Sequence, residues 1–463
     1  MVVKNIVLII SDTFRKDHIS IYGNKAKTPN IDKFSKESIV FENAYPESLP
    51  TIPARRAIYT GIRVFPFKSY SPRKGIPWRT PGWEPIPEEH FSLSEVLKSA
   101  KYRTALISDN YHLFEPSMNF NSGFDEWIFI RGQEYDKYVS SRFEIDILKY
   151  MSSGIPQKVR NTVVEKLLRQ YFANVRYRKS EEDWFAPRVF REGIRWLEEN
   201  RDAEKFFLVL ELFDPHEPWD PPHEFVDIYD PGYNGDEHIT PIYGSSKYLS
   251  KKELRHMRAH YAGEVTLVDK WFGIFLNKIY ELNLDKNTLI IFTSDHGHQL
   301  GEHGIVGKVA WGMYPELMDI PLIIRHPDEI GSGERFHEYV QSHDIFTTIL
   351  ESVGIKVKWR VDGINILKYV EGRREEKRQY ITCSLGNYLM YRDEEYWLIV
   401  NRKGGEAQLY YIKKDPMLKK NIANENLHIV RKLYEKILYD AGGIIPELKI
   451  RPEESIKWYT INE

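Results

Sequence analysis

Short runs of apolar residues alternate with longer amphipathic stretches over most of this chain. The apolar runs are continuous, which is typical of parallel strands that are buried on both faces. They occupy residues 6–10, 102–107, 206–212 and 287–294. Helical periodicity is found at 92–100, where Ser92 is a candidate N-cap, and at 254–280. Strands that alternate with helices in this way predict an α/β fold with a parallel sheet.

The pattern changes beyond residue 370. The stretches 388–400 and 408–412 are typical of hairpin strands, and 426–439 has the periodicity of an amphipathic helix. We therefore expect residues 1–370 to form a large domain and 371–463 to form a small C-terminal α+β subdomain with antiparallel strands and a helix. A chain of 463 residues is long enough for such a division.

Polar residues stand directly after several of the apolar runs. These are Asp12, Asp109, Asp214 and the pair Asp295 and His296. The carboxyl ends of parallel strands meet at one edge of a sheet, and ligands of open α/β folds bind there. The sequence therefore predicts a ligand site at that edge.

A hydroxyl and a guanidinium lie close together in residues 49–61 (LPTIPARRAIYTG). Thr51 offers a nucleophilic oxygen, and Arg55 offers a planar fork of N–H groups for the oxygens of a tetrahedral oxyanion. The alternative interpretation is that Arg55 and Arg56 simply begin a surface helix.

This stretch resembles the signature of the sulfatases, a branch of the alkaline phosphatase superfamily, which is written C/S-x-P-S-R-x-x-x-x-T-G. Thr51 takes the place of the Cys or Ser, and Pro53 and Arg55 match. The resemblance implies an alkaline phosphatase-like fold, with a large mixed, mostly parallel sheet flanked by helices, and a catalytic domain over 1–370. Threonine cannot form the formylglycine of that family, so none is expected. Direct attack by Thr51 is implied instead, as in related phosphodiesterases, phosphonoacetate hydrolases and phosphopentomutases.

The segments that contain Asp12 and Asp295 resemble the two metal-binding blocks of the same family. The resemblance assigns Asp12, Asp295 and His296 as ligands of a divalent metal ion, with Thr13 where many members carry a second Asp. A carboxylate beside an imidazole favours Zn²⁺ or Mn²⁺, whereas Ca²⁺ or Mg²⁺ would suit a shell of oxygens.

The resemblance also assigns residues on the substrate side. Lys308 corresponds to a lysine that contacts the oxyanion of the ester, and His216 corresponds to a histidine that protonates the leaving oxygen. His112 is carried over as a substrate-binding residue, although the lysine that relatives often carry just before it is missing here. His298 and His303, in the second metal block, are expected outside the ligand shell.

Composition narrows the choice of partner. The formal net charge of -2 gives no overall attraction to nucleic acid or to an anionic membrane. The family resemblance implies a small-molecule sulfate or phosphate ester as the partner. The N-terminal apolar run is too short for a signal peptide or a membrane span, which makes a cytoplasmic location the default expectation. The one cysteine, Cys383, excludes an internal disulfide and is expected to be a buried thiol.

Three functions stay open. The first is a metal-dependent hydrolase of the sulfatase family that cleaves sulfate or phosphate esters, including phosphodiesters and phosphonates, by attack of Thr51. The second is a phosphomutase or phosphotransferase of the same superfamily. The third is a catalytically silent relative that binds an anion. Residues 131–188 have the least legible pattern, and we interpret them as an insertion that shapes the substrate pocket.

Overall fold

The computed structural model describes residues 3–68, 80–140, 144–152, 154–155, 163–373 and 377–448. Within this part of the chain, the largest sheet has eight strands. They are β1 (Asn5–Ser11), β2 (Ile39–Tyr45), β3 (Arg103–Ser108), β4 (Glu126–Phe129), β5 (Phe206–Leu212), β7 (Thr288–Ser294), β10 (Leu322–Arg325) and β11 (Arg335–Gln341). Their spatial order is β11-β2-β10-β7-β1-β5-β3-β4.

Most neighbours in this sheet run parallel. β1 pairs in parallel with β5 and β7, β3 pairs in parallel with β4 and β5, and β11 does so with β2. β10 runs antiparallel to both of its neighbours. The expectation of an α/β fold with a large mixed, mostly parallel sheet is confirmed.

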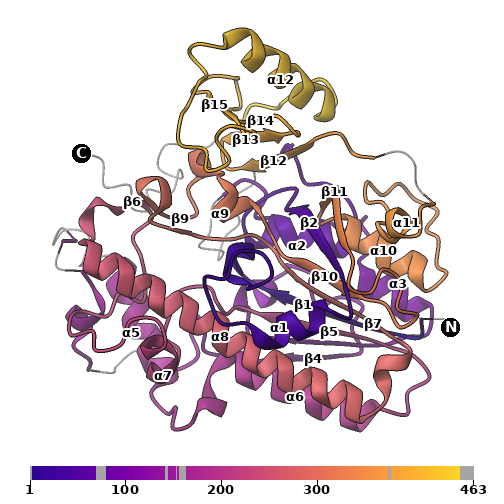
Figure 1. The fold of residues 1–463 in the computed structure, drawn as a ribbon. Coiled ribbons are helices and arrows are strands. Elements are labelled where there is room, and N and C mark those ends of the chain that lie inside the picture. The colour runs from indigo at the N-terminus through magenta and orange to yellow at the C-terminus, as the bar shows by residue number, and fades with distance from the viewer. Residues whose placement is uncertain are drawn as a thin grey trace.

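Helices cover both faces of the sheet (Figure 1). The described α-helices are α1 (Pro29–Ser35), α2 (Thr51–Thr60), α3 (Leu93–Ser99), α5 (Val163–Val175), α6 (Phe185–Asn200), α7 (His223–Asp227), α8 (Lys251–Glu281), α9 (Pro315–Met318), α10 (Asp344–Ser352), α11 (Leu367–Val370) and α12 (Leu427–Asp440). α1, α6 and α8 contribute to the core on one face, and α2, α3 and α10 contribute to the core on the other.

The central strand β1 shows why its sequence is a continuous apolar run. Val7 and Ile9 belong to one core, whereas Ile6, Leu8 and Ile10 belong to the other. Successive side chains of a strand point to opposite faces, so a strand with helices on both sides needs apolar residues at every position.

Two helix starts depend on capping boxes. Ser92 and Glu95 bond reciprocally at the start of α3, which begins where the sequence predicts. Ser250 and Glu253 form the same motif at the start of α8. α8 therefore begins before residue 254, the predicted start, because its polar first turn is held by the cap rather than by apolar contacts.

A second sheet lies near the C-terminus. It contains β12 (Ile381–Leu385), β13 (Tyr388–Arg392), β14 (Tyr396–Asn401) and β15 (Gln408–Tyr411), all antiparallel to their neighbours, and α12 packs against it. The stretch 388–400 is divided by a turn in which Asp393 Oδ1 accepts hydrogen bonds from the backbone N–H groups of Glu395 and Tyr396, at 2.9 and 2.8 Å. The domain boundary at residue 370 stays a prediction.

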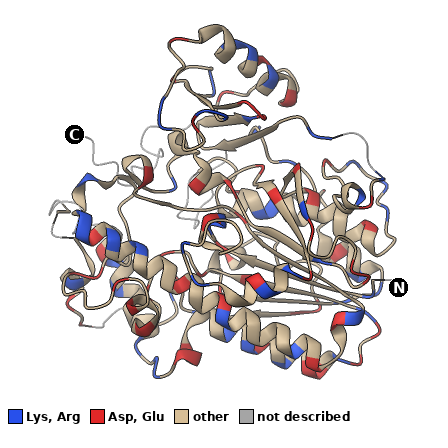
Figure 2. Cartoon of the chain, in the orientation of Figure 1, with Lys and Arg blue, Asp and Glu red and all other residues tan. Residues whose placement is uncertain are grey.

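Residues of both charge signs alternate along the outer helices in the cartoon of Figure 2. This agrees with the net charge of -2. No helix among the described residues is both long enough and apolar enough to cross a membrane. Cys383 is buried, as expected.

We predict that Gly61→Ala destabilises the protein by about 2–4 kcal/mol. Gly61 ends α2 with a φ of 67°. A Cβ there would lie 2.6 Å from the ring of Phe346, so a clash adds to the backbone strain. Gly232→Ala is the matched control, because Gly232 has a φ of 71° and nothing within 4 Å of the added Cβ. Urea unfolding of both variants measures the difference, and equal losses would mean that the Phe346 contact contributes nothing.

Candidate metal centre and active site

Two carboxylates and an imidazole meet at the carboxyl edge of the large sheet. Asp12 follows β1 and Asp295 follows β7, and these neighbouring strands pair in register at Ser11 and Ser294. One ligand atom from each of Asp12, Asp295 and His296 lies within 4.8 Å of the others, and all three residues are fully buried. The fold therefore brings together Asp12, Asp295 and His296 as predicted, and the fourth predicted ligand, Thr13, bonds to Asp295 through its backbone N–H at 3.0 Å.

Several polar atoms of this cluster have no hydrogen-bond partner among the described residues. They are Asp12 Oδ1, Thr13 Oγ1 and His296 Nε2. His296 Nδ1 donates to the carbonyl of Gly297 at 2.8 Å, which leaves a lone pair on Nε2. Asp295 Oδ1 accepts from the backbone N–H groups of Thr13 and His296, at 3.0 and 2.8 Å. Buried polar atoms without partners are rare in proteins, and these oxygens with one imidazole nitrogen fit a divalent metal ion.

The protonation states of the cluster follow from burial. Burial and the charge of Asp295 raise the pKa of Asp12 well above its usual value. Burial opposes the charge on Asp295 as well, but His296 and Arg55 hold the pKa of Asp295 below its usual value. Burial lowers the pKa of His296 to about 4, so the ring is neutral near pH 7 and able to act as a ligand.

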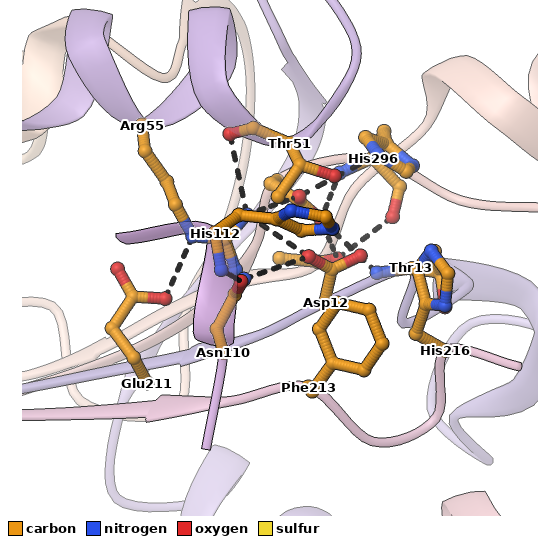
Figure 3. Close-up of polar contacts among 12 residues, drawn as sticks. Asp12, Thr13, Thr51, Arg55, Asn110, His112, Glu211, Phe213, His216 and His296 are labelled. Atoms are coloured by element: carbon orange, nitrogen blue, oxygen red, sulfur yellow. Dashed lines mark hydrogen bonds and ion pairs between the residues drawn. The ribbon is translucent and has the colours of Figure 1, made fainter. Parts of the chain in front are cut away.

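Arg55 is fully buried and surrounded by carboxylates (Figure 3). Its Nη1 lies 3.1 Å from Asp12 and 2.5 Å from Asp295, and its Nε donates to Glu211 at 2.8 Å. Burial alone would lower the pKa of Arg55, but these carboxylates raise it well above the usual value. Nη2 has no hydrogen-bond partner among the described residues. The interpretation of Arg55 as part of a surface helix is therefore wrong.

Sequence reasoning missed Glu211, although a signal was present. Glu211 is the one charged residue in the apolar run of β5, and all seven residues of that strand are buried. Tyr59 also donates to its carboxylate, at 3.2 Å. A carboxylate in a fully buried strand requires a cationic partner, and Arg55 is that partner.

Thr51 is the first residue of α2 and is 2% exposed. Its carbonyl accepts from Arg55 Nη1 at 3.3 Å, and the same nitrogen contacts Asp12 and Asp295. The N-terminus of α2 therefore lies beside the two carboxylates. Figure 3 shows the Thr51 side chain directed toward Asp12 and His296.

Lys308 and His216 form a polar pair near this helix end. Lys308 Nζ lies 2.7 Å from His216 Nε2 and 3.5 Å from Glu217 Oε2. His216 Nδ1 donates to the carbonyl of Glu217 at 2.7 Å, so Nε2 accepts the hydrogen bond from Lys308. Burial and the charge of Lys308 hold the pKa of His216 well below its usual value. The role of His216 as a proton donor stays a prediction.

A cavity of about 250 Å³ opens beside these residues. Its polar lining consists of Thr51, Thr80, His112, Glu134, His216, Glu217, Thr240, Tyr243 and Lys308. Its apolar lining includes Trp83, Val164, Leu167, Pro241, Ala310 and Leu385. Glu134, Val164 and Leu167 come from the region 131–188, which therefore contributes to the pocket. Burial and Glu217 raise the pKa of Glu134 to about 8, and Tyr111 donates to its carboxyl group at 2.8 Å.

The turn after β3 contributes an amide that the sequence analysis did not single out. Asn110 Nδ2 donates to Asp12 Oδ2 at 3.3 Å, and Asn110 Oδ1 accepts from the backbone N–H of His112 at 3.1 Å. Asp109 instead accepts from the backbone N–H of Phe213 at 2.7 Å. Burial and Asp214 raise the pKa of Asp109 to about 8. Asn110 and Asp109, although adjacent in sequence, therefore hold different parts of the site.

The two remaining histidines of the second metal block are not part of the group of three clustered ligands. His298 is fully buried, with Nδ1 3.5 Å from Glu217 Oε2. His303 stacks on Tyr314 with ring centroids 3.9 Å apart, and its Nε2 is 3.6 Å from Glu316.

Comparison with known proteins shows which protein families this chain resembles. The chain matches the family model described as "Sulfatase" over residues 4–355 and the model for the C-terminal part of N-sulphoglucosamine sulphohydrolase over 301–440. It is 27% identical to an arylsulfatase of Clostridium perfringens, over 97% of this chain and 95% of that protein. It is also 27% identical to a multifunctional alkaline phosphatase superfamily protein of Trinickia caryophylli, over 81% and 79% of the two chains.

The fold is also similar to that of solved structures. A phosphonate monoester hydrolase of Agrobacterium radiobacter superposes with a TM-score of 0.74 and 21% identity, over 95% of this chain and 96% of that chain. A phosphonate monoester hydrolase of Silicibacter pomeroyi gives a TM-score of 0.72 and 19% identity, over 94% and 95%. At this level of identity the likeness is one of fold.

We predict that Asp295→Asn lowers the affinity for Mn²⁺ or Zn²⁺ at this cluster by about 100-fold or more, because a charged ligand is lost. Isothermal titration calorimetry measures the affinity. Asp285→Asn, at a partly exposed aspartate 3.6 Å from Arg325, is the control and should bind as the wild type does. Equal affinities of the two variants would contradict the assignment of Asp295 as a ligand.

We predict that Glu211→Gln destabilises the protein by about 1–3 kcal/mol, because it replaces a charge-assisted hydrogen bond to the buried Arg55 with a weaker neutral one. Glu192→Gln removes one partner of an exposed pair with Arg195, so its effect should stay below about 1 kcal/mol. Chemical denaturation of both variants tests the difference, and similar losses would argue against a structural role for the Arg55–Glu211 pair.

Proposed function

The chain belongs to the sulfatase family and is a sulfuric or phosphoric ester hydrolase, and we propose that it uses a divalent metal ion and unmodified Thr51 as its nucleophile. One observation carries this proposal. The N-terminus of α2, which bears Thr51, lies beside a buried cluster of Asp12, Asp295 and His296 whose polar atoms lack partners among the described residues.

Asp12, Asp295 and His296 would hold the ion, and the hydroxyl of Thr13 is a further candidate ligand. Two carboxylates with one imidazole favour Zn²⁺ or Mn²⁺, and Ca²⁺ or Mg²⁺ are the alternatives. When bound, such an ion lowers the pKa of a neighbouring hydroxyl and neutralises the charge of an ester oxygen. Asn110 orients the ligand Asp12 through the hydrogen bond of 3.3 Å.

Thr51 loses its hydroxyl proton to water, and its oxygen then forms a bond to phosphorus or sulfur while the bond to the leaving oxygen breaks. The proton for the leaving oxygen comes from the pair Lys308 and His216, whose Nζ and Nε2 share a hydrogen bond of 2.7 Å. Water then hydrolyses the phosphothreonine or sulfothreonine. Arg55 mainly holds the carboxylates of Asp12, Asp295 and Glu211 in position. Its Nη2 has no partner among the described residues and is the nitrogen that would donate to an oxygen of the ester.

The lining of the cavity favours an apolar leaving group. Trp83, Leu167 and Leu385 all contribute to it, and its volume is about 250 Å³. Sugar hydroxyls would lose hydrogen bonds to water against such walls, whereas an aryl or alkyl group would gain from burial. We therefore propose aryl or alkyl esters of phosphate, phosphonate or sulfate as substrates. His112 and Lys308 would contact the charged phosphoryl, phosphonyl or sulfuryl group of the ester.

We predict that Thr51→Ala reduces kcat by about 10³-fold or more, because the nucleophile is removed. Thr51→Ser is the matched control and should retain activity, because it keeps the hydroxyl. The assay uses nitrophenyl sulfate, nitrophenyl phosphate, a nitrophenyl phosphodiester and a nitrophenyl phosphonate, each with Mn²⁺ and with Zn²⁺. Rapid quenching followed by peptide mass spectrometry should locate a covalent adduct on Thr51 of the wild type.

The same assay separates the alternative functions. A phosphotransferase would pass the group to an added alcohol instead of releasing the inorganic anion. A silent relative would leave the wild type and Thr51→Ala equally inactive on every substrate, and that result would overturn the proposal.

A further inference from the structure

A second cluster of metal-ligating side chains lies outside the active site. His256 and His260 are one turn apart on α8 and therefore share a face of the helix. Glu237 reaches them from the loop 228–243, which joins α7 to the short strand β6 (Gly244–Ser245). Glu237 Oε2 is 2.6 Å from His256 Nε2 and 2.5 Å from His260 Nε2. None of these residues takes part in the Asp12 cluster or in the reaction proposed above.

Both ring nitrogens of His256 face carboxylates. His256 Nδ1 lies 3.2 Å from Asp230 Oδ2, and a carboxylate can only accept, so Nδ1 carries a proton. His256 Nε2 lies 2.6 Å from Glu237 Oε2, and a proton or a metal ion at this nitrogen satisfies that contact.

The surroundings match those of a metal-bound histidine. A histidine that binds a metal through one nitrogen usually donates its other N–H to a carboxylate, as His256 does to Asp230. His256 is 1% exposed and stacks on Tyr233, with ring centroids 3.5 Å apart. His260 is also buried, and its Nδ1 has no hydrogen-bond partner among the described residues, so no hydrogen bond there opposes the use of Nε2 as a ligand.

We propose that Glu237, His256 and His260 bind a metal ion of the zinc class, separate from the ion of the active site. Two imidazoles and one carboxylate form the donor set of a zinc site with one open position, whereas Ca²⁺ and Mg²⁺ prefer oxygens. A cavity of about 370 Å³, lined by Glu237 and His260, adjoins the cluster and provides room for a water as the fourth ligand.

Binding requires a small movement of one ligand. Ligand atoms of a tetrahedral zinc ion lie about 3.3 Å apart, since each is about 2.0–2.1 Å from the metal. The nitrogen–oxygen distances of 2.5 and 2.6 Å must therefore lengthen. Glu237 is the residue able to move, because it lies on a loop and its side chain is 28% exposed.

The ion would fasten the loop 228–243 to α8 and so support the wall of the active-site cavity. Thr240, Pro241 and Tyr243, a few residues beyond Glu237, line that cavity. Tyr261, next to His260 on α8, donates to the carbonyl of Thr13 at 2.7 Å. The role is one of positioning, because no ligand of this second site touches the reacting groups.

Zinc binding to the full-length Asp295→Asn protein tests the proposal, because that change weakens the active-site cluster. Calorimetry should detect one tight Zn²⁺ site in this background. Adding Glu237→Gln or His260→Phe should weaken it by about 100-fold, since a ligand is lost. His238→Gln is the matched control: His238 is adjacent to Glu237 but pairs with Glu253 at 3.0 Å, so zinc binding should persist.

One spectroscopic and one crystallographic measurement complete the test. Co²⁺ bound in the Asp295→Asn background should give the intense visible absorption of a tetrahedral site, and Glu237→Gln should abolish it. Crystals of the wild type soaked in Zn²⁺ should show an anomalous peak between His256 and His260, which settles the matter even if a variant fails to fold. No tight site in the Asp295→Asn background and no such peak would mean that the three residues form a hydrogen-bonded cluster only. Loss of activity on Thr51→Ala bears on the active site alone, so the two proposals fail separately.

Discussion

The structure depends on the balance of charge around one buried guanidinium. Arg55 contacts Asp12, Asp295 and Glu211, and all four residues are fully buried. Three carboxylates exceed the single charge of Arg55, and an uncompensated buried charge is strongly unfavourable. The excess must be neutralised by a proton, to which the raised pKa of Asp12 points, or by a metal ion. The buried carboxylates therefore favour binding of a cation at the place where we propose that an anionic ester reacts.

The sheet and one helix create this balance together. β1, β5 and β7 are adjacent and in register, so the residues that follow them emerge at one edge. Ile52 and Ile58 anchor α2 in the core on one face of the sheet, and Arg55 extends from the helix to the strand ends. The same helix end presents Thr51, so the proposed nucleophile and the charge that holds the carboxylates share one rigid element.

The long helix α8 connects the two candidate metal sites. Tyr261 supports the Thr13 turn through a hydrogen bond of 2.7 Å, while His256 and His260 hold the loop that leads to Tyr243 in the active-site cavity. The strand end of the candidate metal cluster and a wall of the cavity, which are distant in the sequence, therefore both contact this helix or a loop attached to it. A shift of α8 would therefore move both the Thr13 turn and the cavity wall at Tyr243.

The sequence by itself determined the elements whose signals are local. Continuous apolar runs identify strands buried on both faces, and the Ser92 cap identifies α3, because these patterns need only neighbouring residues. The ends of those strands, with the family resemblance, also identified Asp12, Asp295 and His296. Only the tertiary structure revealed β10 and β11 as strands of the large sheet. β10 has only four residues, and the first four residues of β11 are partly covered or exposed, so neither forms a continuous apolar run in the sequence. The tertiary structure alone paired Glu211 with Arg55, because 156 residues separate them and no local pattern records which buried charges will meet.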